Sequence, residues 1–170
     1  MIKNLTRIKN KGTLLALFSP LFLVGILHVV TEFTFRIYTN RSDSLPKGFY
    51  KSVDKKSIEV GDIVAFEVPE NVLNLIQSRQ LNSYKRFFKR VAAMPGDYVC
   101  YSTDSVIIFD TYYPIKKDTL TSLGLSLANN CGPVPAGYFF AMSDDIANGF
   151  DSRYYGLVPA TNIEDVIIKL

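Results

Sequence analysis

Two serines that could act as nucleophiles, Ser42 and Ser44, stand in the stretch NRSDSLPKGFYK, residues 40–51. Serine beside proline and glycine commonly serves only the turn itself. It becomes a nucleophile when a neighbouring base accepts its proton, and histidine is the most frequent base. The one histidine of the chain, His28, lies in an apolar stretch, so the rest of the chain cannot build a Ser-His-Asp triad. A catalytic role for these serines would therefore need a lysine as the base.

Lys89 has the sequence context that such a base requires. Lysine accepts a proton only when it is neutral, and its ordinary pKa is about 10.4. Burial among apolar groups lowers this pKa, so the useful lysine should face the core from a strand. In an alternating strand Lys89 shares a face with Phe87 and Val91. The pattern therefore predicts an inward-facing lysine, although an exposed one remains open because lysine is seldom buried.

Lys47 is the alternative base, because Ser44 and Lys47 match a Ser-x-x-Lys spacing. That spacing brings the two side chains together on one turn of helix. Pro46 and Gly48 favour an extended turn instead. We therefore expect Lys47 to lie apart from the serine hydroxyl.

The residues around Ser44 indicate how it would be presented. Pro46 biases Leu45 toward an extended conformation, which predicts an exposed rim. Leu45 and the aromatic pair at 49–50 are expected to hold this rim to the core. Ser42 lies two residues back, on the same side of an extended chain, where its hydroxyl could donate to a developing oxyanion. A simple turn role for both serines remains the alternative.

Other chemistries lack the residues that they need. Two isolated cysteines are no zinc cluster, and the acidic stretch at 143–151 lacks the alternating carboxylates and closing glutamate of a calcium loop. No glycine-rich phosphate loop is present. Four of the 19 basic residues precede residue 12, which leaves 15 against 16 acidic residues in the remainder. This balance argues against a nucleic-acid surface, and we expect no metal and no cofactor.

An uncharged stretch of 20 residues, 12–31, has the length of a membrane-crossing helix. A cleavable signal peptide is the alternative, but the exit HVVTEFTF lacks a small-x-small site. Residues 1–11 carry four basic and no acidic residues, which places them in the cytoplasm by the positive-inside rule. We therefore expect a single-pass anchor with residues 39–170 outside the cytoplasm. In that compartment Cys100 and Cys131 can form a disulfide that stabilises by roughly 3–4 kcal/mol, although two buried thiols remain possible.

The part beyond the anchor has the pattern of a mainly β fold. Alternating apolar residues bounded by glycine and proline turns are typical of half-buried strands. One short helix is expected at 70–81, and residues 117–130 are expected to be mostly loop. Several short strands with little helix favour an antiparallel β-sandwich or folded barrel. The predicted strands are 61–68, 85–94, 97–101, 105–110, 137–142 and 165–170.

Three blocks in this order resemble the type I signal peptidase superfamily of membrane-anchored Ser-Lys proteases. They are SDSLP (42–46), KRVAAMPGD (89–97) and SDDIANGFDSRYYGLVP (143–159), and the resemblance covers most of residues 39–164. The proline two residues after the serine, the phenylalanine before Asp-Ser-Arg and the two cysteines resemble the TraF-type conjugative-transfer branch. The resemblance implies a signal-peptidase-like antiparallel fold.

Residue roles follow from this resemblance. It implies that Ser44 is the nucleophile and Lys89 the general base, with the Ser44 N–H and the Ser42 hydroxyl as oxyanion donors. Many members orient the lysine with a serine at the position of Gly149, so Ser143 or a water would have to substitute. The remaining matches imply structural support, from a turn carboxylate and a buried ion pair; these residues are Asp97, Asp151 and Arg153.

The implied function is an endopeptidase that cleaves signal or pro-peptides from exported, membrane-tethered precursors such as pilins. Its partners would be an extended precursor peptide and, through residues 12–31, membrane lipid. The expected location is the bacterial cytoplasmic membrane, with the catalytic domain in the periplasm. The alternatives are a housekeeping signal peptidase of broad range, and an inactive or structural pilus-assembly homologue.

Overall fold

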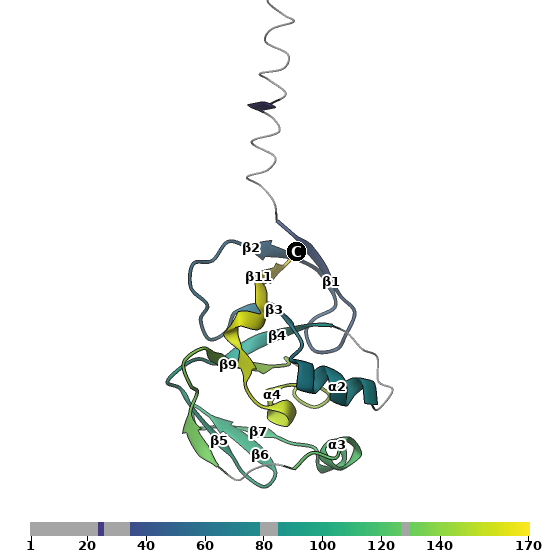
Figure 1. Ribbon diagram of the computed structural model, residues 1–170, viewed down its shortest axis with the longest axis vertical. Coiled ribbons are helices and arrows are strands. Elements are labelled where there is room, and N and C mark those ends of the chain that lie inside the picture. Colours follow the sequence, from purple (N-terminus) through teal and green to yellow (C-terminus); the bar gives the residue numbers. More distant parts are fainter. Residues whose placement is uncertain (1–23, 26–34, 79–84, 127–129) are drawn as a thin grey trace, which may run out of the picture. The chain divides into compact units, whose positions relative to one another are not determined.

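The computed structural model describes residues 24–25, 35–78, 85–126 and 130–170. Arg36–Leu170 forms one compact unit, built mainly of antiparallel strands as predicted (Figure 1). The anchor predicted at 12–31 and the basic segment 1–11 lie almost wholly outside the described residues. Within the described ranges, no helix combines the length and the apolar character needed to cross a membrane.

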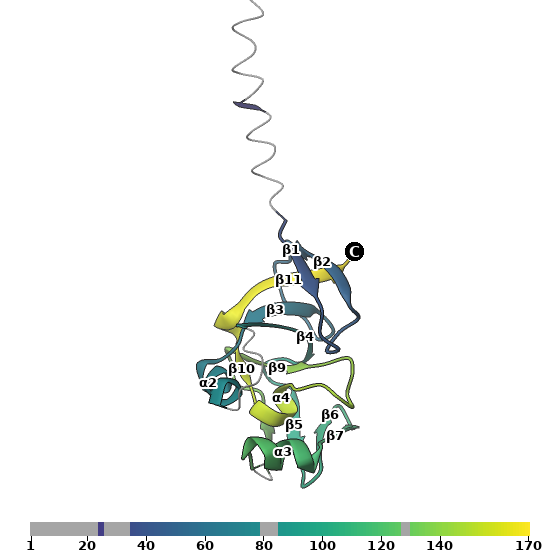
Figure 2. The same ribbon diagram turned by 90° about the vertical axis from the view of Figure 1, so that its right-hand side faces the viewer.

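The larger sheet has seven strands in the order β1-β2-β11-β3-β4-β9-β10. Figure 2 shows β11, β3 and β4 side by side in its middle. Four predicted strands correspond to β3, β4, β9 and β11, with ends that differ by a few residues, whereas β1, β2 and β10 were not predicted. The strands are β1 Ile37–Asn40, β2 Gly48–Val53, β3 Ile63–Glu67, β4 Arg86–Ala93, β9 Tyr138–Met142, β10 Val158–Pro159 and β11 Ile163–Lys169.

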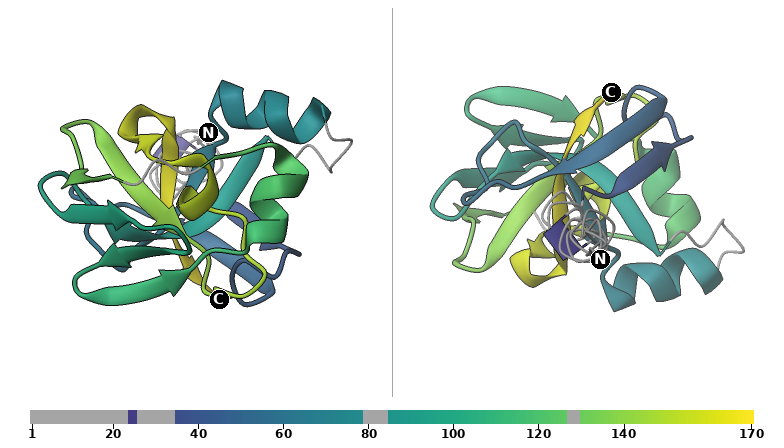
Figure 3. Two further views of the ribbon diagram at one scale, coloured as in Figure 1. Left: turned by 90° about the horizontal axis from the view of Figure 1, so that it is seen from below. Right: turned by 90° about the horizontal axis from the view of Figure 1, so that it is seen from above.

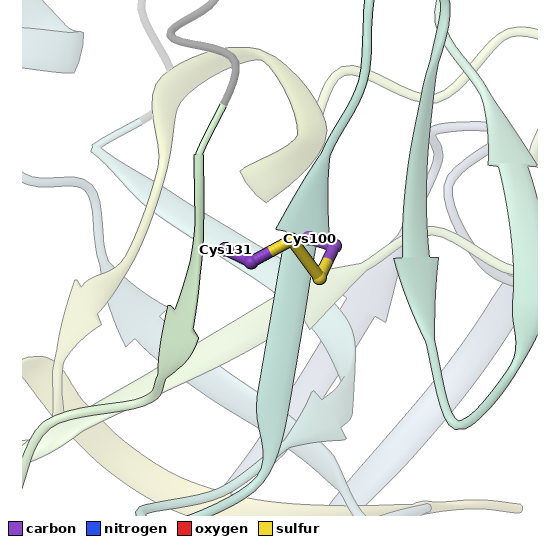
Figure 4. Close-up of a disulfide and its surroundings, with 2 residues drawn as sticks. All are labelled: Cys100 and Cys131. Atoms are coloured by element: carbon purple, nitrogen blue, oxygen red, sulfur yellow. A yellow bond between two sulfur atoms is a disulfide. The ribbon is translucent and has the colours of Figure 1, made fainter.

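The smaller sheet has four strands in the order β7-β6-β5-β8. It lies at the end of the unit opposite β1 and β2 (Figures 1 and 2). Cys100 on β5 lies directly opposite Cys131 on β8, and a disulfide joins them (Figure 4). The predicted bridge therefore ties the edge strand to the sheet. These strands are β5 Tyr98–Tyr101, β6 Ser105–Ile108, β7 Thr111–Pro114 and β8 Cys131–Pro133.

Short helices complete the unit. The predicted helix is α2, Glu70–Ser78, which buries Val72 and Ile76 one helical turn apart. The prediction that 117–130 is mostly loop was wrong for residues 117–123, because α3, Lys117–Leu123, packs two leucines into the core and ends at Gly124 with a left-handed φ of 67°. Figure 3 shows α2 and α3 on the same side of the unit. The other helical segments are α4, Ser152–Tyr155, and the 3-10 turn η1, Ala160–Asn162.

β9 is buried on both faces, which fixes the position of the residues that follow it. Phe139 and Ala141 pack into the core of the larger sheet, while Phe140 and Met142 pack against the smaller sheet. Fully burying one such side chain contributes roughly 1.5–3 kcal/mol. The chain therefore leaves β9 at a well-determined point, where Ser143 begins the loop to α4.

Candidate active site

Lys89 is the centre of the site. It lies on β4 with a side chain only 2% exposed, and its Nζ is 5.4 Å from the centre of the Phe87 ring. Its Nζ lies 2.7 Å from Ser44 Oγ and 2.8 Å from Ser143 Oγ. Both distances are hydrogen-bond distances. The amine and the two hydroxyls, which come from segments far apart in the sequence, are thus brought together.

Burial lowers the pKa of the Lys89 amine, which is what a lysine base requires. Removal from water lowers the pKa of Lys89 from its ordinary value of 10.5 to about 8. The Asp151 carboxylate raises this pKa and the Arg153 guanidinium lowers it, but both effects are smaller than that of burial. A substantial fraction of the amine is therefore neutral near pH 8, and a neutral amine can accept the Ser44 proton.

Ser44 lies in a turn rather than on the extended rim that was predicted. Leu45 is buried beside Tyr50, and the Tyr50 hydroxyl donates a 2.7 Å hydrogen bond to the Pro46 carbonyl. Phe49 does not hold the turn as expected, because its side chain is exposed. From the other side, the Asp144 N–H donates to the Ser44 carbonyl at 2.7 Å. These contacts fix the backbone that presents the Ser44 hydroxyl.

Asn40, at the end of β1, is a site residue that the sequence analysis missed. Its side chain is 3% exposed, and its Nδ2 donates to the carbonyls of Leu45 at 2.8 Å and Ser42 at 3.1 Å. Its Oδ1 accepts from the Ser42 N–H at 3.2 Å and from the Ser42 hydroxyl at 2.8 Å. The only sequence signal was an asparagine just before the serine stretch. The amide therefore links both ends of the turn and holds the Ser42 side chain.

Lys47, the alternative base, lies at the surface. Its Nζ forms an ion pair with Asp43 at 2.8 Å, and both side chains are mostly exposed. Ser44 Oγ instead lies 2.7 Å from Lys89 Nζ. The geometry therefore favours Lys89 as the partner of Ser44.

Ser143 occupies the space that a side chain at position 149 would need. A Cβ added to Gly149 would lie 2.2 Å from Ser143 Oγ and 2.3 Å from Ser143 Cβ. The hydroxyl beside Lys89 thus comes from the end of β9, and the Ser143 N–H is itself held by Asp151 Oδ2 at 3.0 Å. The family pattern has a serine at position 149, and here a glycine is needed there because Ser143 fills the space of that side chain.

This shared space makes a testable exchange possible. We expect Gly149→Ser to lower kcat/KM about 100-fold, because a displaced Ser143 no longer orients the lysine and small misplacements have effects of this size. The double variant Ser143→Gly, Gly149→Ser should regain part of the activity, since it supplies one hydroxyl and removes the clash with Ser143, while the Asp145 carbonyl, 2.7 Å from the added Cβ, must still shift. Cleavage of a peptide substrate measures both. Full activity of the single variant would contradict the shared space.

Asp151 and Arg153 form a fully buried ion pair below the site. Arg153 Nε and Nη2 donate to the two carboxylate oxygens at 2.8 and 2.9 Å. The guanidinium also donates to the carbonyls of Pro114, Ile146 and Gly149. The pair therefore ties the loop between β9 and α4 to the smaller sheet. Asp97 lies elsewhere and closes its own turn, where its Oδ2 accepts from the Met94 N–H at 2.8 Å.

A hollow of about 140 Å³ lies beside Ser44, between the end of β1 and the start of β4. Ser42, Asn40 and Arg86–Phe88 contribute to its lining. β4 pairs with β3 along Arg86–Arg90 but with β9 only from Arg90 onward. Among the described residues no strand covers the other edge of β4 before Arg90, so an extended peptide has room to pair there. In the same part of the chain, no three His, Cys, Asp or Glu side chains gather as metal ligands.

The chain is similar in sequence to several curated signal peptidases. The probable signal peptidase I-1 of Synechocystis sp. (strain ATCC 27184 / PCC 6803 / Kazusa) is 31% identical over 108 residues, which cover 62% of this chain and 50% of that protein. Signal peptidase I of Pseudomonas fluorescens is 27% identical over 152 residues, which cover 65% and 50%. The chain thus spans about half the length of these curated relatives.

A crystal structure of a signal peptidase I from Enterococcus faecalis V583 aligns with a TM-score of 0.40 and 24% identity, over 66% of this chain and 98% of that chain. The family described as "Signal peptidase, peptidase S26" matches residues 11–168, nearly the full length. The chain therefore belongs to the signal peptidase, peptidase S26 family.

Proposed function

We propose that this protein is a serine endopeptidase of the signal peptidase I type, which removes signal peptides from exported precursors outside the cytoplasm. The observation that carries this proposal is the 2.7 Å separation of Lys89 Nζ and Ser44 Oγ in a buried setting. Residues 12–31 would anchor the protein in the cytoplasmic membrane, where its precursors are also tethered. Membrane lipid and an extended precursor peptide would be its partners.

In the proposed mechanism, neutral Lys89 accepts the proton of Ser44 as Ser44 Oγ attacks the carbonyl carbon of the scissile bond. The Ser44 N–H and the Ser42 hydroxyl donate to the oxyanion, for which Ser42 must turn its proton away from Asn40 Oδ1. The lysine then gives its proton to the departing amine. Water, deprotonated by the same lysine, releases the acyl group and restores Ser44. Ser143 holds the lysine amine in place throughout.

The substrate would bind as an extended strand along the open edge of β4. Its residues before the cut would lie in the hollow beside Ser44, whose volume of about 140 Å³ suits small side chains. Main-chain hydrogen bonds to β4 would supply affinity that does not depend on the side chains of the substrate. We therefore expect the protein to prefer small residues just before the cut.

The pH dependence follows from the pKa of Lys89. Because only the neutral amine accepts a proton and its pKa is lowered to about 8, we expect kcat/KM to rise about tenfold per pH unit below pH 8 and to level off above it. Initial rates on one non-ionising peptide between pH 6 and 10 measure this, with circular dichroism as the control for folding. A flat profile would argue against a titrating lysine.

The range of precursors that the protein cleaves distinguishes a signal peptidase of broad range from a specialised one. A narrower TraF-type role in conjugative transfer, with pilin precursors as substrates, is favoured by SDSLPKGFY and by the disulfide between β5 and β8. The test is to incubate the full-length chain in detergent with a secretory precursor and with a pilin precursor, and to sequence the new N-termini. We expect cleavage of the secretory precursor after a small residue. Cleavage of the pilin precursor alone would support the narrower role, and cleavage of neither would refute both.

A further inference from the structure

A second and larger hollow, of about 510 Å³, lies on the far side of Lys89 from the first. The two follow one another along β4, which contributes Arg86–Phe88 to the first and Arg90–Ala92 to the second. Ser143 and Asp144 also line the second hollow. Their contacts with the Lys89 amine and with the Ser44 carbonyl place this hollow directly beside the dyad.

The path of an extended peptide leads into this hollow. Beyond Arg90 the edge of β4 is covered by β9, so a peptide on that edge has to leave the sheet at the cut. It then crosses the loop that begins at Ser143, where the second hollow opens. An extended chain advances about 3.3 Å per residue, so the first few residues after the cut come within reach of its walls.

The walls of the hollow are mostly apolar, and its two charged groups are paired with each other. Phe109, Tyr113, Met142 and Ile146 contribute apolar surface. The charged groups in its lining, Arg90 and Asp144, are joined to each other by two hydrogen bonds of 2.8 Å. A site of this kind favours an apolar side chain over a charged one, because a charge would lose water without gaining a partner.

Phe109 is held out to this hollow by a strained turn. It and Asp110 form the two-residue turn between β6 and β7, with φ values of +48° and +60°. Asn-Gly is the usual choice for such a turn, and a bulky residue with positive φ is a genuine outlier. The side chain is nevertheless 59% exposed, so it gains little from burial in return. Strain of this kind persists where the residue serves a function.

We propose that the second hollow binds an apolar side chain of the substrate just after the cleaved bond, and that Phe109 determines this specificity. The assignment rests on the proposed peptidase function and extends it to the departing half of the substrate. The contact acts only until the acyl group is formed, because the residues after the cut leave with the first product. It therefore changes the acylation step and leaves the release of the acyl group unaffected.

Phe109→Asn is the variant that tests the assignment, because asparagine suits a positive φ and the turn should remain folded. The full-length chain in detergent is given two peptides that are identical up to the cut, with leucine or glycine at the second and third positions after it. We expect the unmodified protein to prefer the leucine peptide, and Phe109→Asn to reduce this preference about tenfold. Tyr112→Asn is the matched control, since Tyr112 is 71% exposed on the neighbouring strand and does not line the hollow.

Three outcomes decide the question. A reduced preference in Phe109→Asn, with Tyr112→Asn unchanged, supports the assignment. An equal loss on both peptides, or no change at all, overturns it and leaves the peptidase function standing. Failure of the unmodified protein to cut either peptide overturns the proposed function, and the assignment falls with it.

Discussion

Replacing Lys89 by methionine is expected to lower cleavage of a precursor peptide by about 10⁴-fold or more while the protein stays folded. The thioether side chain fills similar space but cannot accept the proton of Ser44. Ser44→Ala should have an effect of similar size and should not add to it, because the two groups act as one unit. Single-turnover cleavage assays on the two variants and the double variant measure this. Lys47→Ala is the control, since its amine is paired with Asp43 at the surface, and it should remain active.

Lys89→Met should also change the stability of the protein in a pH-dependent way that general damage to the fold would not produce. The pKa of Lys89 is about 8 when folded against an ordinary 10.5, so the unfolded chain binds more protons between these values. The parent should therefore gain stability as the pH rises from about 8 to 10.5. At pH 7 we expect Lys89→Met to be more stable by roughly 1–3 kcal/mol, an advantage that disappears above about pH 10. Equal stability of the two proteins at every pH would contradict a buried, neutral amine.

Replacing Arg153 by methionine is expected to destabilise the fold by about 3–5 kcal/mol. The substitution leaves the Asp151 carboxylate buried without its partner and removes the donors to three backbone carbonyls. For a unit of this size the melting temperature should fall by roughly 10 °C. Thermal unfolding followed by circular dichroism at pH 7 measures the change.

Arg36→Met is the matched control for this experiment. Arg36 forms an ion pair with Asp165, but its side chain is mostly exposed, and exposed pairs contribute little. Its melting temperature should stay within about 2 °C of the parent. If Arg153→Met melts as the parent does, the buried pair is not what holds the loop between β9 and α4.

Much of the site could be predicted because its decisive signals are local. The alternation of residues 87–91 placed Lys89 on the core-facing side of a strand, and the structure buries it there beside Phe87. The position of His28 excluded a histidine base, and Pro46 and Gly48 argued against Lys47, which stayed the alternative. The membrane anchor stays a prediction, since the described residues include only 24–25 of the segment 12–31. The TraF-type role also stays a prediction, since the comparisons show the family and no branch of it.

The missed features depend on contacts with residues outside the segment concerned. The turn at Ser44 is set by Tyr50 and Asn40 and by the loop after β9, which no pattern within 42–46 reveals. The residues of α3 are mostly weak helix formers, so local propensity favoured a loop, and burial of Leu120 and Leu123 outweighed it.

By itself the sequence determined the kind of chemistry: one inward-facing lysine, serines before a proline turn, and strands whose alternation specifies which side is buried. Only the tertiary structure decided which hydroxyls meet that amine, because they lie 45 and 54 residues away along the chain. It also decided that Ser143, and not position 149, supplies the second hydroxyl, since the two side chains would need the same space. Alternation along a strand is a local property, whereas the sharing of volume between side chains exists only once the chain is folded.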